Sequence, residues 1–298
     1  MGKSIVFGAN GYLGRHLMKY LTTKSEDVLA VGKKKYSIDG YKNYFQLDIT
    51  QRSQFSKINF EVENIYFLSA KTGTLDSFEY YQEFTNVNEL GLLNLLDYLK
   101  STHFRPKIIF PSSRLVYRGM KNVFLSEESQ LEGKTVYAIN KIACENYLKA
   151  YNNLFSIPFI VLRICVPYGN LFGSDYSYGT IGYFLSKAYE KQDISLYGDG
   201  SQKRTFTHIE DITEIMGLCA KNDIINKIIN IGSEDNMSIK EAAQVVARHY
   251  QTKVIQIPWP SEQQKIESGD TIFDDKKLKH IFNYTYKIRF REWIETLD

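Results

Sequence analysis

Tyr137 and Lys141 form the clearest chemical pair in this sequence. They are four positions apart, so on a helix they share one face. An ammonium beside a phenol stabilises the phenolate, which lets Tyr137 exchange a proton near neutral pH. Ser113 lies upstream, directly after an apolar run, and its hydroxyl can hold the same substrate oxygen. The three residues predict proton exchange with a hydroxyl or ketone while a nicotinamide exchanges a hydride.

The spacing of Tyr and Lys is weak evidence without its context. The same spacing begins at Tyr20, Tyr117 and Tyr183, in a chain with 22 tyrosines. Only the Tyr137 copy opens a long helical pattern downstream of a strand that ends in Pro-Ser-Ser. For the other three we favour a surface Tyr and Lys on a helix, and that remains the alternative for Tyr137.

A glycine-rich loop lies near the start of the chain. Gly8, Gly11 and Gly14 stand between the apolar run 4–7 and a helical pattern. At such a turn the free N–H groups of the helix start attract phosphate, and glycines let the backbone approach it. A purely structural turn is the alternative. The loop residues expected to contact a dinucleotide are Gly8, Asn10, Gly11, Tyr12, Leu13 and Gly14.

The residues after the second apolar run bear on the choice of dinucleotide. NAD-binding proteins usually carry Asp or Glu at this point, to accept a hydrogen bond from the ribose 2′-hydroxyl. Here the run 28–31 leads into Gly32 and then Lys33 and Lys34. Lysines attract a 2′-phosphate, so the sequence favours NADP(H), with NAD(H) as the alternative. A solvated basic turn would look the same.

Short apolar runs alternate with helical patterns through the first half of the chain. Strands are expected at 4–7, 28–31, 64–68, 107–110 and 159–162, with helices at 90–99 and 137–151. This order predicts an α/β fold, a Rossmann-type doubly wound parallel sheet. The rhythm breaks after Arg163, which predicts a smaller mixed α/β C-terminal substrate domain. We expect residues 1–165 and about 205–235 in the dinucleotide-binding domain, and about 166–204 and 236–298 in the substrate domain.

Composition excludes several classes of protein. A net charge of +3 without long basic runs argues against a nucleic-acid partner. The three cysteines and five histidines show no ligand spacing, so we expect no metal and a reducing cytoplasmic setting. No apolar run approaches the roughly 18 residues of a membrane span.

The longer motifs resemble the extended short-chain dehydrogenase/reductases, in the NAD(P)-dependent nucleotide-sugar epimerase/dehydratase branch. The stretch 197–212, YGDGSQKRTFTHIEDI, resembles a signature of that branch. The resemblance implies cofactor contacts from Asp48, Ile49, Leu68, Ser69 and Ala70, besides Tyr137 and Lys141. It adds Asn88 to the catalytic residues Ser113, Tyr137 and Lys141. It also implies that Arg204, with His208 and Ser113, binds the substrate, Arg204 through its diphosphate.

Some positions depart from that family's pattern. Ser113-Arg114-Leu115 stands where dehydratases of the branch carry Thr-Asp-Glu, which argues against 4,6-dehydratase activity. Val166 replaces a usual asparagine, and Glu267 lies near the place of a second phosphate-binding arginine. These departures concern the sugar and the base of the substrate.

Together these features predict an NADP(H)-dependent oxidoreductase that acts on a nucleoside-diphosphate sugar. The leading hypothesis is a 4-keto-sugar reductase in surface-polysaccharide precursor synthesis. A 4-epimerase that retains its NAD(P) is the first alternative, and a non-catalytic dinucleotide-binding protein the second. The resemblance further implies a homodimer.

Overall fold

The computed structural model describes residues 3–173 and 178–298, and the chain divides into two compact units. The first comprises residues 1–116, 133–163 and 213–229, and the second comprises 117–132, 164–212 and 230–298. This division differs from the expected one at residues 117–132, 205–212 and 230–235, which group with the second unit. Residues 117–132 do so because β6 (Phe124–Leu125) pairs with β14 (Ile272–Phe273) of that unit. Residues 205–208 belong to a strand that pairs with residues 235–238 of the same unit.

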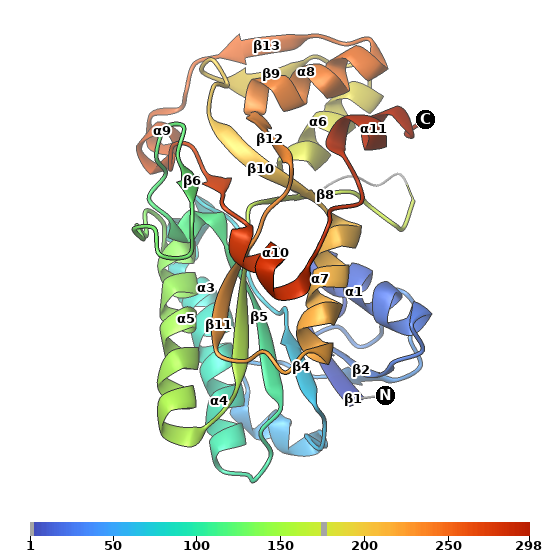
Figure 1. Ribbon diagram of the computed structural model, residues 1–298, viewed down its shortest axis with the longest axis vertical. Helices are drawn as coiled ribbons and strands as arrows, with labels where there is room; N and C mark the ends of the chain where they lie inside the picture. Colours follow the sequence, from blue (N-terminus) through green and yellow to red (C-terminus); the bar gives the residue numbers. More distant parts are fainter. Residues whose placement is uncertain (1–2, 174–177) are drawn as a thin grey trace. The chain divides into compact units, whose positions relative to one another are not determined.

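A seven-stranded sheet forms the core of the first unit (Figure 1). Its order is β11-β7-β5-β4-β1-β2-β3, and the strands from β3 to β5 pair in parallel. Val6 at the centre lies opposite Ala30 on one side and Tyr66 on the other. The strands are β1 (Lys3–Phe7), β2 (Asp27–Gly32), β3 (Tyr44–Gln46), β4 (Asn64–Phe67), β5 (Lys107–Ser113), β7 (Phe159–Ile164) and β11 (Lys227–Ile231).

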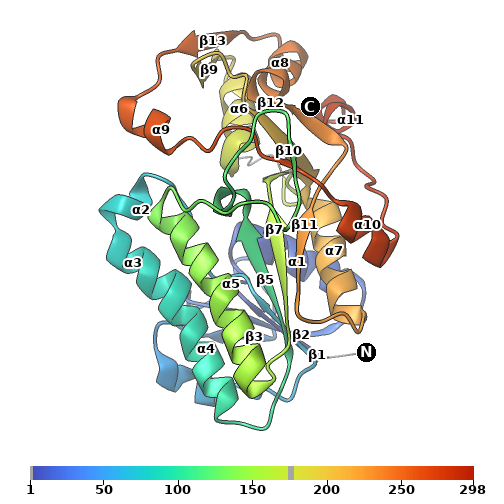
Figure 2. The same cartoon turned by 60° about the vertical axis from the view of Figure 1, so that its left-hand side comes forward.

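Helices cover both faces of this sheet, as Figures 1 and 2 show. On one face α4 (Gly91–Lys100) and α5 (Val136–Phe155) bury Leu92, Leu96 and Leu148 against strand residues such as Ile65. On the other face lie α1 (Tyr12–Thr23) and α7 (Ile209–Lys221), which are packed so closely that a methyl group on Gly217 would meet the Tyr20 ring. Shorter helical segments are η1 (Arg52–Lys57), α2 (Asp76–Glu79), α3 (Tyr81–Thr85), η2 (Asn86–Leu90) and η3 (Arg114–Val116).

The chain order of the strands reverses between β1 and β4. The chain leaves β1 for β2 and β3 on one side, then crosses to β4 and β5 on the other. In open α/β sheets ligands bind beyond the carboxyl ends of the strands at such a switch point. The predicted doubly wound fold is therefore confirmed, and its switch point lies at the glycine loop after β1.

Small sheets and helices build the second unit. In its largest sheet β10 (Lys203–His208) pairs antiparallel with β12 (Asp235–Ser238) and parallel with β8 (Val166–Tyr168). A parallel pair joins β9 (Ile194–Tyr197) to β13 (Val254–Ile257). The helices are α6 (Gly179–Tyr189), α8 (Ile239–Tyr250), α9 (Ser261–Ile266), α10 (Lys276–Phe282) and α11 (Phe290–Glu295).

Candidate functional site

The glycine loop makes a tight turn from β1 into α1. Gly8 has a φ of +83°, and a side chain there would lie 2.7 Å from the backbone nitrogen of Ser69. A methyl group on Gly14 would come within 2.0 Å of the Gly8 carbonyl oxygen. Gly11, at the N-cap of α1, offers no side-chain cap, and the first turn holds no acidic residue. The positive end of the helix is thus open to an anion, which fits a dinucleotide pyrophosphate.

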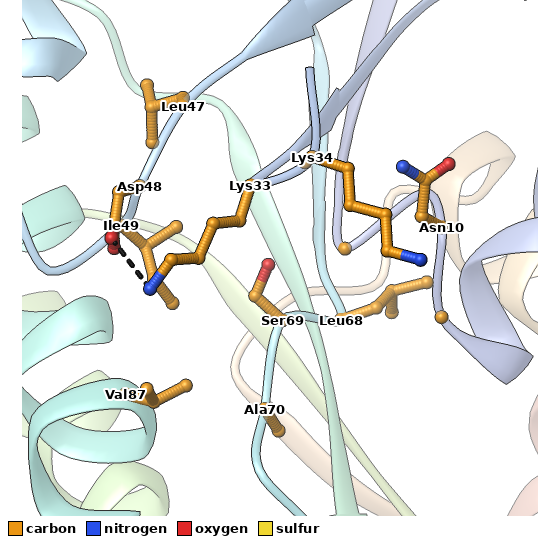
Figure 3. Close-up of a pocket in the computed structure, with 13 residues that line it drawn as sticks. Asn10, Lys33, Lys34, Leu47, Asp48, Ile49, Leu68, Ser69, Ala70 and Val87 are labelled. Carbon is orange, nitrogen blue, oxygen red and sulfur yellow. Dashed lines mark ion pairs between the residues drawn. The ribbon is translucent and has the colours of Figure 1, made fainter. Parts of the chain in front are cut away.

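A cavity of about 260 Å³ opens beside this loop within the first unit (Figure 3). Gly32, Leu47 and Val87 line it and had no role in the sequence-based site. Their types explain this, because one glycine and two aliphatic residues carry no chemical signature. The residues that both line the cavity and were expected to contact a cofactor are Gly8, Asn10, Gly11, Lys33, Lys34, Asp48, Ile49, Leu68, Ser69 and Ala70.

The two lysines at the end of β2 have different surroundings. Figure 3 shows that they leave the strand in opposite directions. The Lys33 ammonium lies 3.0 Å from the Asp48 carboxylate. Burial raises the pKa of Asp48, but hydrogen bonds from Thr50 and Lys33 outweigh it and lower the pKa overall. Within the described part of the chain, Lys34 makes no ion pair, so its charge is available to a ligand.

Asn10 organises the segment that follows β2. Its amide nitrogen donates to the Tyr36 carbonyl oxygen and the Tyr44 hydroxyl, at 3.1 and 3.2 Å. Its amide oxygen accepts from the Ile38 backbone nitrogen at 2.9 Å. Asn10 therefore shapes the wall of the cavity as well as lining it.

The helix that carries Tyr137 and Lys141 is fastened to the end of β5. Thr135 caps α5 by accepting from the Ala138 nitrogen at 3.1 Å. The buried Lys141 ammonium donates to the Pro111 carbonyl oxygen at 2.8 Å and lies 5.9 Å from the centre of the Tyr137 ring. Burial lowers the pKa of Lys141 to about 8, with partial opposition from Cys144 and Glu145.

The hydrogen bond from Lys141 to Pro111 joins α5, which carries Tyr137, to β5, which ends at Ser113. Ser113 is the last residue of β5, and its half-buried hydroxyl oxygen accepts from the Leu115 nitrogen at 3.2 Å. Tyr137 lies one turn before Lys141 on α5 and is 8% exposed. The fold thus brings the Ser113 strand end and the Tyr137 helix start together through Lys141.

Asn88 lies in η2, a single π-helical turn. Its amide oxygen accepts from the Lys71 backbone nitrogen at 2.7 Å, and its amide nitrogen donates to the Lys71 carbonyl oxygen at 3.0 Å. Both amide groups are therefore engaged with the loop after β4. Asn88 shapes that loop, next to Ala70 of the cavity wall.

Arg204 and His208 lie in the second unit, on β10. The guanidinium of Arg204 is 2% exposed and donates to the Glu267 carboxylate and to the carbonyl oxygens of Gly269 and Lys203. The His208 ring packs edge-on against Tyr168, with centroids 5.1 Å apart.

Among the described residues, no group of three or more His, Cys, Asp or Glu could hold a metal ion. In the same part of the chain, the helices lack the length and apolarity needed to cross a membrane.

The fold and the loop are those of a dinucleotide-binding α/β protein. Residues 4–232 match the model of the NAD dependent epimerase/dehydratase family, which is most of the chain. The protein belongs to that family, whose members are enzymes of the extended short-chain dehydrogenase/reductase type. The resemblance drawn from its motifs is thereby confirmed.

Two curated relatives and one solved structure illustrate the likeness. A putative UDP-glucose 4-epimerase from Methanocaldococcus jannaschii is 28% identical over 81% of this chain and 80% of its own. A UDP-N-acetyl-alpha-D-glucosaminuronate decarboxylase from Bacillus cytotoxicus is 28% identical over 86% of this chain and 84% of its own. The UDP-glucose 4-epimerase of Thermus thermophilus in complex with NAD has a TM-score of 0.87 at 21% identity, over 98% of this chain and 96% of its own.

Proposed function

We propose that this enzyme reduces a 4-keto group on a nucleoside-diphosphate sugar with NADPH, in the supply of surface-polysaccharide precursors. The observation that supports it most is the attachment of the Tyr137–Lys141 helix to the Ser113 strand end. That attachment lies in the same unit as the glycine loop and its cavity.

Each of the three residues has a distinct task in this proposal. The bound nicotinamide supplies or takes up the hydride. Tyr137 donates a proton to the carbonyl oxygen of the sugar as the alcohol forms. Lys141 stabilises the phenolate left on Tyr137, and Ser113 donates a hydrogen bond that holds the same oxygen in line. In the oxidative direction Tyr137 takes the proton back.

The choice of NADPH is supported by the end of β2. Gly32 provides no carboxylate for a ribose 2′-hydroxyl. Lys34 lines the cavity, and among the described residues its ammonium has no ion-pair partner. Lys33 contributes less, because Asp48 already neutralises it. A 2′-phosphate would therefore meet Lys34 first. NAD is the cofactor typical of the family, and it is the alternative that binding assays must compare.

A 4-epimerase that retains its cofactor is the second candidate. The names of similar proteins favour it, since they include a UDP-glucuronate 4-epimerase of Thermodesulfobacterium geofontis, 25% identical over 99% of this chain. Such an enzyme returns the hydride to the other face of the same sugar. It therefore has no net consumption of reduced dinucleotide.

Two measurements separate these candidates. Purified protein is desalted and examined for bound dinucleotide, and NADPH or NADH consumption is then followed with UDP- and dTDP-4-keto sugars. Stoichiometric oxidation of NADPH supports the reductase. Retained dinucleotide with interconversion of sugar epimers, and no net oxidation, supports the epimerase. Absence of both activities on every sugar tested would overturn the proposal.

The roles of the residues are tested by Tyr137→Phe. We expect turnover to fall by about 100-fold or more, because proton transfer is lost, while dinucleotide affinity stays the same. Tyr20→Phe is a matched control, since the Lys24 ammonium lies 6.0 Å from the Tyr20 ring, on α1. That variant should keep wild-type turnover. If Tyr137→Phe also keeps it, the assignment is wrong.

A further inference from the structure

Three buried polar side chains meet directly behind the attachment of α5 to β5. Glu145 of α5 is 1% exposed, Arg163 of β7 2% and Ser112 of β5 5%. The Arg163 guanidinium binds the Glu145 carboxylate with two nitrogens, at 3.0 and 2.6 Å. The Ser112 hydroxyl donates to the same carboxylate at 2.6 Å. All three belong to the first unit.

This cluster is linked to the proposed catalytic residues along both elements. On α5, Glu145 lies one turn after Lys141, so the two side chains share a face. On β5, Lys141 holds the Pro111 carbonyl, Glu145 holds the Ser112 hydroxyl, and Ser113 is next. Two neighbouring side chains of the helix thus fix two consecutive residues of the strand, and that fixes the backbone from which Ser113 projects.

The cluster is also electrostatically placed to act on Lys141. Among the described residues, several groups near Lys141 titrate or carry charge. Tyr137, Cys144 and Glu145 lie on α5, and Arg163 of β7 lies behind Glu145. Glu89 of η2 is also near, and it accepts hydrogen bonds from Asn140 and Tyr147. Burial raises the pKa of the Cys144 thiol to about 12, so that group is neutral where Lys141 titrates. Glu145 is then the main anionic neighbour that favours the ammonium form of Lys141.

Stability alone does not account for this arrangement. A buried ion pair is costly to desolvate, and apolar residues of similar volume are often equally stabilising. We propose that Glu145, oriented by Arg163, is a positioning residue that aligns Ser113 through Ser112 and keeps Lys141 in its ammonium form. The role of Lys141 rests on the function proposed above, but the coupling between the two side chains does not.

The test is Glu145→Gln, which keeps the shape and most hydrogen bonds but removes the charge. Without the carboxylate the pKa of Lys141 should fall further below its present value near 8. The basic limb of the kcat profile should therefore move to lower pH by roughly one unit, with the KM for the sugar nearly unchanged. The control is Glu26→Gln, which breaks the Glu26–Lys221 pair of the same unit and should leave the profile unchanged.

A second readout is independent of turnover. With lysines labelled by ¹³C at Cε, the Lys141 signal, assigned by its loss in Lys141→Arg, gives its titration in the protein without ligands. We expect it to titrate at lower pH in Glu145→Gln. If wild-type protein turns over no sugar, the proposed function fails, whereas this titration still decides the role of Glu145.

If Glu145→Gln does not fold, the double variant Glu145→Met with Arg163→Met serves in its place, because it removes both charges together. In that protein kcat should fall about tenfold or more while the fold is retained, because Ser112 has lost its acceptor. A folded Glu145→Gln protein with the wild-type pH profile and the wild-type Lys141 titration would overturn the proposal. A change in melting temperature alone, without a change in either profile, would also overturn it.

Discussion

Arg204 already donates three hydrogen bonds inside the second unit. Its guanidinium binds the Glu267 carboxylate and two carbonyl oxygens, and it is almost fully buried. Glu267 also accepts from the Gly269 nitrogen at 3.0 Å, which holds this loop in place. A diphosphate that binds the same nitrogen of Arg204 as Glu267 must compete with this carboxylate. The expected substrate role of Arg204 therefore implies an exchange of one anion for another.

Glu267→Gln tests that exchange. If Arg204 binds the diphosphate, the variant should bind UDP several-fold more tightly by calorimetry, because the competing charge is gone and the repulsion of phosphate with it. Glu262→Gln, on the exposed face of α9, is the control for a charge change nearby and should leave affinity unchanged. Unchanged or weaker binding in Glu267→Gln would assign Arg204 to the fold of the second unit.

At the scale of elements, the glycine loop shows how finely the turn after β1 is packed. The carbonyl oxygen of Gly8 accepts from the Gly11 nitrogen at 2.9 Å and lies under the Cα of Gly14. A side chain at position 14 would meet backbone, which cannot move aside as a flexible side chain can. A side chain at position 11 would approach the same oxygen only to 3.3 Å.

The two positions should therefore respond differently to alanine. Gly14→Ala should lose dinucleotide binding and about 1–3 kcal/mol of unfolding free energy, because the loop must shift to admit the methyl group. Gly11→Ala should keep most of the unfolding free energy, and any loss of dinucleotide binding there reflects the methyl group at the expected phosphate site and not a shift of the loop. Urea unfolding and dinucleotide titration of the two variants make the comparison. Equal losses of unfolding free energy in both would show that the packing of Gly14 does not control the loop.

The sequence predicted the elements with strong local patterns and missed those without them. The apolar runs of β1, β2, β4, β5 and β7 are confirmed as strands. By contrast β3 has three residues and no apolar run, and the π-helical turn η2 continues the pattern of its flanking helices. Such elements depend on tertiary pairing, which local propensity does not encode.

The same reason limits what the sequence could say about the site. The residues of the glycine loop can be identified from the sequence by their type and spacing. The bonds of Asn10 to Tyr36 and Ile38, and of Asn88 to Lys71, join residues 17 to 28 positions apart with no motif between them. The Glu145–Arg163 pair had no signal either, since a charged residue on a helix usually faces solvent. Only the fold shows that it is buried.

At the scale of the whole molecule, one face of α5 carries an uncharged stripe that is exposed or half-buried in the described part of the chain. Ile139, Ala143, Asn146, Ala150 and Leu154 follow one another at spacings of three or four, none is charged, and all are exposed or half-buried. Ile139 is 53% exposed and Leu154 74%. Leu90, 42% exposed, adds to it from η2, which contacts α5. An uncharged stripe of this kind is typical of a helix that packs on a second copy.

We therefore expect a homodimer in which this stripe is covered. Light scattering should give a mass near twice the 34.6 kDa of one chain. Ile139→Glu with Leu154→Glu should weaken association at least tenfold, because two carboxylates would have to be desolvated in the interface. Ile225→Glu, at a residue that is 44% exposed but lies before β11, should leave the dimer intact. A wild-type monomer, or a double variant that remains dimeric, would place the stripe outside any subunit interface.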